Sequence, residues 1–228
     1  MPAINPVKRN IEHIMGKTLT VNEIFFSIQG ETSHSGLPTV FIRLTGCPLR
    51  CQYCDTEYAF HEGEKITISK ILRDVGQYRT RYVTVTGGEP LAQRACVDLL
   101  SLLCDEGYQV SLETSGAVDI KNVDERVCKI LDIKTPGSGE SKKNRLDNLK
   151  YLTANDQIKF VVCDRDDYEW TRNMVHDLQL HERCEVLLSP SHEQLDAVQL
   201  ADWILEDQLP VRLQIQLHKY LWGDIPGH

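Results

Sequence analysis

Runs of apolar, β-branched and aromatic residues alternate along the chain with segments of helical periodicity. Two such runs near the start, residues 22–31 and 39–46, are typical of strands that flank a Gly-Leu-Pro turn. Residues 68–80 carry apolar side chains at i, i+3 and i+4 spacing, which predicts a helix. From residue 82 onward the two patterns alternate regularly. The further predicted strands are 82–86, 109–112, 129–133, 158–162, 185–188 and 211–215, and the further predicted helices are 91–106, 166–178 and 192–206.

This βα repetition predicts an α/β fold with a mostly parallel sheet. Because 228 residues are too few for a full eight-fold barrel, we expect an abbreviated, partly open (βα) barrel. We expect one domain over residues 1–228, with its core at about 20–222. Most predicted strands end in polar or glycine-bearing strings, and the carboxyl ends of such strands build active sites. Only residues 135–155 resemble an unstructured insertion.

Composition narrows the class of protein. With 41% hydrophobic and 25% charged residues, the chain can bury one substantial core. A net charge of −8 disfavours binding to a nucleic-acid backbone and favours a small-molecule substrate. The opening residues lack the apolar core of a signal peptide, and no stretch approaches the length of a membrane span, so we expect a cytoplasmic protein without membrane contact. A basic cluster at 141–145 is interpreted as a solvated loop.

Three cysteines lie in one eight-residue string, CPLRCQYC: Cys47, Cys51 and Cys54. A four-iron cluster normally takes a thiolate on every iron, so three cysteines leave one iron open to another ligand. Asp55 and Thr56 follow directly. The string therefore predicts a metal centre with a vacant coordination position.

Two alternatives remain open at this point. A Cys3His zinc site could use His61 as its fourth ligand. The next cysteine, Cys96, lies too far downstream to supply the second ligand pair of a zinc ribbon or finger. An electron-transfer module is the other alternative, and spacing alone does not separate it from a catalytic centre.

The string TGGEP, residues 86–90, ends a predicted strand. Its paired glycines let a ligand approach the backbone closely, and the carboxylate of Glu89 can accept hydrogen bonds from an amine. Alone it is also compatible with an ordinary turn.

Together these motifs resemble the radical S-adenosylmethionine (SAM) enzymes, in which the open iron holds the methionine part of SAM. The strings FFSIQGE, CDT, ETSG and QLHKYLWG further resemble the 7-carboxy-7-deazaguanine synthase family, over residues from about 21 to the C-terminus. The resemblance implies conversion of 6-carboxy-5,6,7,8-tetrahydropterin to 7-carboxy-7-deazaguanine, with ring contraction and loss of ammonia, in queuosine and 7-deazapurine biosynthesis. It also implies a [4Fe-4S] cluster, SAM and Mg²⁺, an external one-electron donor such as a flavodoxin, and a homodimer.

The resemblance further assigns roles to individual residues. Cys47, Cys51 and Cys54 would hold the cluster, and Thr56 would bind Mg²⁺. The residues expected to bind SAM are Tyr53, Cys54, Asp55, Gly88, Glu89, Asp132, Ile133, Lys134, Ser189, Pro190, Ser191 and His192. The residues expected to bind the pterin are Ile28, Gln29, Gly30, Glu31, Arg43, Thr86, Glu113 and His218.

Small departures from the family pattern affect the pocket details. Thr32 follows QGE where glycine is frequent, and the chain continues past HKY as LWGDIPGH. The small glycyl-radical activating enzymes, which share the cysteine spacing and a similar length, remain a second hypothesis with a protein substrate.

Overall fold

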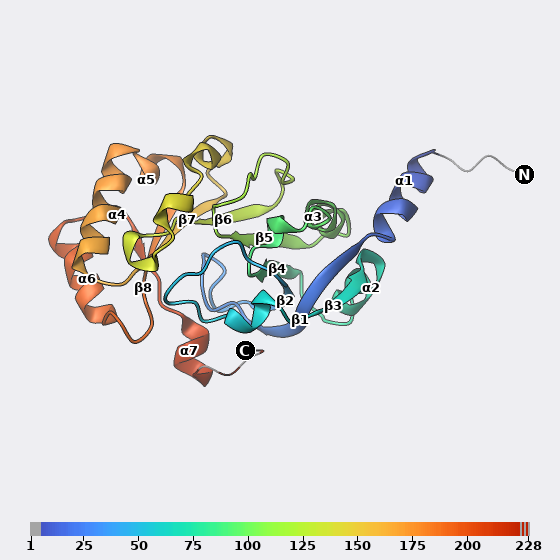
Figure 1. Ribbon diagram of the computed structural model, residues 1–228, viewed down its shortest axis with the longest axis horizontal. Helices are drawn as coiled ribbons and strands as arrows, with labels where there is room; N and C mark the ends of the chain where they lie inside the picture. The colour runs from blue at the N-terminus through green and yellow to red at the C-terminus, as the bar shows by residue number, and fades with distance from the viewer. Residues whose placement is uncertain (1–5, 224, 226, 228) are drawn as a thin grey trace, which may run out of the picture.

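The computed structural model describes residues 6–223, 225 and 227. One nine-stranded sheet runs through the molecule in the order β3-β1-β2-β4-β5-β6-β7-β8-β9 (Figure 1). The strands are β1 (Thr18–Ile28), β2 (Pro38–Leu44), β3 (Glu64–Thr67), β4 (Tyr82–Gly87), β5 (Gln109–Thr114), β6 (Cys128–Asp132), β7 (Gln157–Val162), β8 (Glu185–Pro190) and β9 (Arg212–Leu213). The α-helices are α1 (Pro6–Met15), α2 (Ile68–Val75), α3 (Cys96–Asp105), α4 (Arg165–Asp177), α5 (Leu180–Arg183), α6 (Ala197–Glu206) and α7 (Leu217–Trp222).

The sheet is mostly parallel and open. β1 pairs antiparallel with both β2 and β3, and every pairing from β2 to β9 is parallel. Parallel neighbours need long crossovers. α2, α3, α4 and α6 lie in four of them, whereas the crossovers from β5 to β6 and from β6 to β7 contain no α-helix. Since β3 and β9 form the two edges, the predicted partly open α/β arrangement is confirmed. No helix within the described ranges is long and apolar enough to cross a membrane.

The two faces of the sheet differ in chemistry. On β4, Val83 and Val85 belong to the hydrophobic core, whereas the alternate residues Thr84 and Thr86 face the other way. On β7, Ile158 and Phe160 enter the core in the same manner. The outer face therefore buries an apolar core under the helices, and the inner face is left to carry polar side chains.

The expectation that residues 135–155 form an unstructured insertion is wrong. Three short 3₁₀ helices, Pro136–Ser138, Ser141–Lys143 and Leu146–Tyr151, occupy the segment. Side-chain amides anchor it to the neighbouring backbone: Asn144 bonds both the N–H and the carbonyl of Lys134, just before the segment, at 2.9 and 2.8 Å. Hydrogen bonds of this kind order a chain that shows no periodicity in sequence.

This segment also packs against the cysteine loop. The Gln52 N–H donates to the Ser138 carbonyl at 3.1 Å, and the Arg50 N–H donates to Glu140 Oε1 at 2.7 Å. Lys143, from the basic cluster, donates to the Pro48 carbonyl at 3.1 Å. The cluster at 141–145 is therefore more than a solvated loop, because it helps to support the loop that carries the cysteines.

Several element boundaries differ from the sequence prediction. α3 begins at Cys96 rather than 91 because Pro90–Ala92 forms a 3₁₀ turn. α6 begins at Ala197 because the Asp196 side chain caps it, accepting from the Val198 N–H at 2.7 Å. The strand expected at 211–215 is reduced to β9. The helices α1 and α7 and the edge strand β3 were not predicted.

A buried tyrosine ties α4 to α6 and yields a stability prediction. The hydroxyl of the fully buried Tyr168 lies 2.7 Å from the Trp203 carbonyl and 2.9 Å from Asp207 Oδ2. We expect Tyr168→Phe to lower the free energy of unfolding by about 1–2 kcal/mol in urea denaturation. Asp207 keeps its ion pair with Arg172, which limits the loss. Tyr151→Phe, at a more exposed ring, should change stability by less than about 0.5 kcal/mol, and equal effects of the two substitutions would contradict the prediction.

Candidate active site

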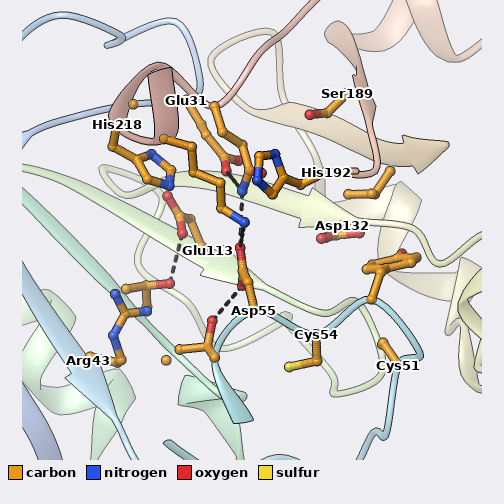
Figure 2. A pocket seen from close by; sticks show the side chains of 18 of the residues that line it. Glu31, Arg43, Cys51, Cys54, Asp55, Glu113, Asp132, Ser189, His192 and His218 are labelled. Carbon is orange, nitrogen blue, oxygen red and sulfur yellow. Dashed lines mark hydrogen bonds and ion pairs between the residues drawn. The ribbon is translucent and has the colours of Figure 1, made fainter. Parts of the chain in front are cut away.

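A cavity of about 290 Å³ opens at the carboxyl ends of the parallel strands, on the inner face of the sheet (Figure 2). Its lining comes from the ends of β1, β2, β4, β5, β6, β7 and β8, from the cysteine loop and from α7. Carboxyl ends of neighbouring parallel strands share one edge, so residues distant in sequence converge there. Three groups of side chains make up the cavity wall.

The cysteine loop forms the first group. It leaves β2 at Gly46, whose φ of 98° is a conformation that favours glycine. Cys47, Cys51 and Cys54 all line the cavity. Burial raises the pKa of Cys51 to about 11, so its thiol keeps its proton until a metal displaces it.

The three thiols suit a cluster better than a single ion. Within the described part of the chain, no three His, Cys, Asp or Glu side chains converge closely enough to hold one metal ion. A four-iron cluster can take one thiolate on each of three irons, which fits three thiols that line the same cavity. His61 does not line the cavity, which disfavours the Cys3His zinc alternative.

The TGGEP string packs directly on the cysteine loop. The Glu89 N–H donates to the Gly46 carbonyl at 2.8 Å, and a Cβ placed on Gly88 would lie 2.8 Å from the Cys47 Cβ. Gly87 has a φ of 141°. These glycines therefore allow two loops to touch where any side chain would force them apart.

The carboxylate of Glu89 does not face the cavity. It is fully buried and accepts hydrogen bonds from the Leu91 N–H at 3.0 Å and from the Ser115 N–H at 2.8 Å. The Thr114 hydroxyl also donates to it, at 2.9 Å. The side chain thus fixes the shape of the loop, and Gly87 and Gly88, which line the cavity, are the residues of this string left to meet an amine there.

The second group, around Tyr53, offers polar atoms to a ligand. Lys134 forms a 2.8 Å ion pair with Asp132 Oδ2 and lies 5.8 Å from the centre of the Tyr53 ring. The Tyr53 hydroxyl and Asp132 Oδ1 are buried without a hydrogen-bond partner among the described residues. Buried polar atoms normally have partners, so these two atoms fit a polar molecule such as SAM lying beside the cysteine loop.

The third group is charged and lies on the other side of the cavity. Glu31, just beyond β1, forms an ion pair with Lys159 of β7 and accepts from Gln216 at 2.9 Å. Glu113 of β5 accepts from the Thr86 hydroxyl at 2.8 Å. Figure 2 shows Glu31, Glu113 and His218 around the same space.

The two glutamates of this group differ in protonation. Burial alone would raise the pKa of Glu31, but the charge and hydrogen bond of Lys159, together with His218 and the hydrogen bond from Gln216, outweigh burial and lower it. Burial raises the pKa of Glu113, and the negative charge of Glu31 raises it further. Two carboxylates with oppositely shifted pKa values give the cavity one fixed anion and one group that takes up a proton more readily.

Gln29 connects these groups and is almost fully buried. Its side-chain amide donates to the Thr84 hydroxyl at 3.1 Å and to Glu113 at 3.4 Å, and its carbonyl accepts from the Glu31 N–H at 3.1 Å. The QGE string therefore turns its glutamine inward to orient both glutamates.

The helix α7 contributes His218 and Lys219 to the lining of the cavity. The Leu217 N–H donates to the Gly30 carbonyl at 2.9 Å, and the His218 ring lies against Gly30, which has no room for a Cβ. Lys219 pairs with Asp55 at 3.2 Å. Burial lowers the pKa of His218, so its imidazole is held in the neutral form. α7 thus joins the charged group to the residues that follow the cysteines.

The structure brings nearly all predicted site residues to this cavity. The exceptions are Glu89 and Ile133; Ile133 is buried in the core, and its N–H donates to the Lys159 carbonyl at 2.9 Å. Thr56 lines the cavity and donates to Asp55 at 2.7 Å. The individual binding roles stay predictions.

Sequence reasoning missed Lys159, Gln216 and Lys219, which also line the cavity. Lys159 had a signal: it is a charged residue at the centre of a strand that is otherwise largely apolar. Gln216 and Lys219 belong to the QLHKYLWG string, but no role was assigned to them because their contacts depend on where α7 docks.

An open parallel sheet with a three-cysteine loop after β2 and a glycine loop after β4 is the architecture of the radical SAM class. A family model described as the Radical SAM superfamily matches residues 41–136. That class implies a [4Fe-4S] cluster and SAM as cofactors.

Full-length relatives give the particular family. The 7-carboxy-7-deazaguanine synthase of Koribacter versatilis is 42% identical, over 90% of this chain and 97% of its own. That of Chlorobaculum tepidum is 43% identical, over 90% and 94%. The crystal structure of QueE from Escherichia coli superposes with a TM-score of 0.75 at 24% identity, covering 91% of this chain and 98% of that one, and supports the fold. The chain belongs to the 7-carboxy-7-deazaguanine synthase family.

Proposed function

We propose that this protein converts 6-carboxy-5,6,7,8-tetrahydropterin to 7-carboxy-7-deazaguanine, with ring contraction and loss of ammonia, as a step of queuosine and 7-deazapurine biosynthesis. One observation carries the proposal beyond family membership: a single cavity joins the three-cysteine loop to a charged wall made by Glu31, Arg43 and Glu113. A glycyl-radical activating enzyme acts on a protein and does not call for such a charged wall in a cavity of small-molecule size.

The residues divide the cavity between cofactors and substrate. Cys47, Cys51 and Cys54 would hold the cluster, with SAM against Tyr53 and the partnerless Asp132 Oδ1. Bound there, the cluster and SAM would supply the carbon-centred radical that removes hydrogen from C6 of the pterin.

The charged wall would bind and orient the pterin. Glu31, kept ionised by Lys159, is suited to accept hydrogen bonds from the N–H groups of the pyrimidine edge. The guanidinium of Arg43 suits the substrate carboxylate. Thr56 would contribute to a Mg²⁺ site, because Mg²⁺ prefers oxygen ligands and binds through few protein atoms together with substrate oxygens.

The remaining requirements concern partners. The reaction needs an external one-electron donor, for which a flavodoxin is suitable, and we propose a cytoplasmic homodimer as the working form. The electron donor and the homodimer follow from family resemblance. The cytoplasmic location follows from the reducing conditions that an iron–sulfur cluster tolerates.

The decisive experiment is anaerobic incubation of the reconstituted protein with the carboxylated pterin, SAM, Mg²⁺ and a chemical reductant. We expect 7-carboxy-7-deazaguanine and ammonia in equal amounts, with many turnovers for each SAM molecule. Reactions that lack SAM or the reductant are the controls. Cleavage of SAM without any deazapurine would rule out the proposed substrate.

A further inference from the structure

Arg43 is held on three sides before any ligand binds. The carbon of its guanidinium lies 5.5 Å from the centre of the Phe25 ring and 5.7 Å from the centre of the Tyr58 ring. Its Nε donates to Glu23 Oε1 at 2.7 Å. The side chain is only 15% exposed. A long side chain that usually samples many rotamers is therefore confined to one place on the cavity wall.

The partners of Arg43 are themselves fixed. Glu23 and Arg43 are register partners on the antiparallel strands β1 and β2. The Tyr58 hydroxyl donates to the same Glu23 Oε1, at 3.0 Å, from the 3₁₀ helix that follows the cysteine loop. Phe25 stacks on Phe41 with ring centres 4.9 Å apart. Glu23 thus joins the strand that carries Arg43 to the 3₁₀ helix that follows the cysteine loop.

We infer that Glu23 and Tyr58 are positioning residues for Arg43, and that the three together give the cavity its preference for a carboxylated substrate. The inference rests on the proposed function. A guanidinium binds a carboxylate best through two parallel N–H donors, which requires its plane to be oriented. Glu23 accepts the hydrogen bond from Arg43 Nε, and the two aromatic rings fix the plane of the guanidinium. The two terminal nitrogens of Arg43 are therefore already oriented, so less side-chain entropy is lost when a carboxylate binds.

The charge of Glu23 works against this effect and makes the inference testable. A carboxylate beside Arg43 weakens the attraction of the guanidinium for a second carboxylate. If Glu23 only competed with the substrate carboxylate for Arg43, neutralising Glu23 would tighten the binding of the substrate. If Glu23 positions Arg43, neutralising it weakens binding of the substrate.

The experiment compares two ligands in the cluster-loaded, SAM-bound protein: the carboxylated pterin and its 6-carboxamide analogue. For Glu23→Gln we expect about a tenfold loss of affinity for the carboxylate ligand, within the range for hydrogen bonds to charged groups. Affinity for the carboxamide should change by less than about twofold, and kcat should be nearly kept while KM rises. Tyr58→Phe should give a smaller loss in the same direction.

Controls separate positioning from general damage. Asp74→Asn removes a comparable 2.8 Å ion pair on α2, outside the cavity, and should change neither affinity. In an Arg43→Lys background, Glu23→Gln should not further reduce the preference for the carboxylate over the carboxamide ligand. Glu23 acts on that preference only by orienting the Arg43 guanidinium, which this background lacks. Equal losses for both ligands, or tighter binding of the carboxylate, would overturn the inference. Failure of the proposed function looks different: the unaltered protein would then turn over no pterin at all.

Discussion

Cys51→Ala should abolish cluster binding and, with it, all cleavage of SAM. Cys51 lies at the centre of the three-cysteine loop and lines the cavity. With two thiolates left, a cluster that already lacks one protein ligand has too few anchors to persist. We expect iron and sulfide contents near zero after anaerobic reconstitution, loss of the visible absorbance of the cluster, and no product above background in the pterin assay.

A matched control separates this effect from the loss of any cysteine. Cys104 is a half-buried thiol of α3 that packs against the core away from the cavity. Cys104→Ala should keep the iron content and the activity, with at most a small loss of stability. A Cys51→Ala protein that still held four irons and cleaved SAM would show that the loop is not the cluster site.

The sequence predicted the framework well because strands and motifs are local features. Continuous apolar runs placed the parallel strands, and the polar strings after them marked the edge where Glu113 and Asp132 now meet. The cysteine loop and TGGEP were each ambiguous alone and were recognisable in combination, because both are short local strings. The structure adds the reason they occur together: the Glu89 N–H donates to the carbonyl of Gly46, just before the first cysteine.

What the sequence could not predict depends on contacts between distant segments. The order of residues 135–155 comes from side-chain amides such as Asn144, whose effect no periodicity reveals. Glu89 was expected to face an amine, and instead its carboxylate is occupied by Thr114 and Ser115 of a neighbouring strand end. Lys159 and Glu31 lie 128 positions apart, and only the folded sheet brings them into contact.

Lys159→Met should cause the second large effect, because it removes the cation that keeps Glu31 ionised. The two side chains are 13% and 12% exposed, so their ion pair is largely withdrawn from water. Removing one partner of a buried pair typically costs about 3–5 kcal/mol, since the remaining charge is left buried without compensation. The folded protein can limit that cost by protonating Glu31, which then no longer accepts hydrogen bonds from the substrate. We therefore expect at least a hundredfold loss of kcat/KM for the pterin, while the iron content stays normal.

The pH dependence of stability gives an independent measurement with a definite sign. In the unaltered protein Lys159 lowers the pKa of Glu31, so the pair contributes stability above the ordinary pKa of a glutamate, and this contribution is lost as the pH falls through the lowered value. In Lys159→Met only the smaller contributions of His218 and Gln216 oppose burial, so we expect that pKa to rise and the variant to lose stability as the pH rises. The difference in unfolding free energy between the two proteins should accordingly be larger at pH 8 than at pH 5 in urea denaturation. Lys70→Met, which breaks the exposed pair with Asp74, should cost less than about 0.5 kcal/mol at either pH. A loss in Lys159→Met that was the same at both pH values would show that the ammonium does not control the charge of Glu31.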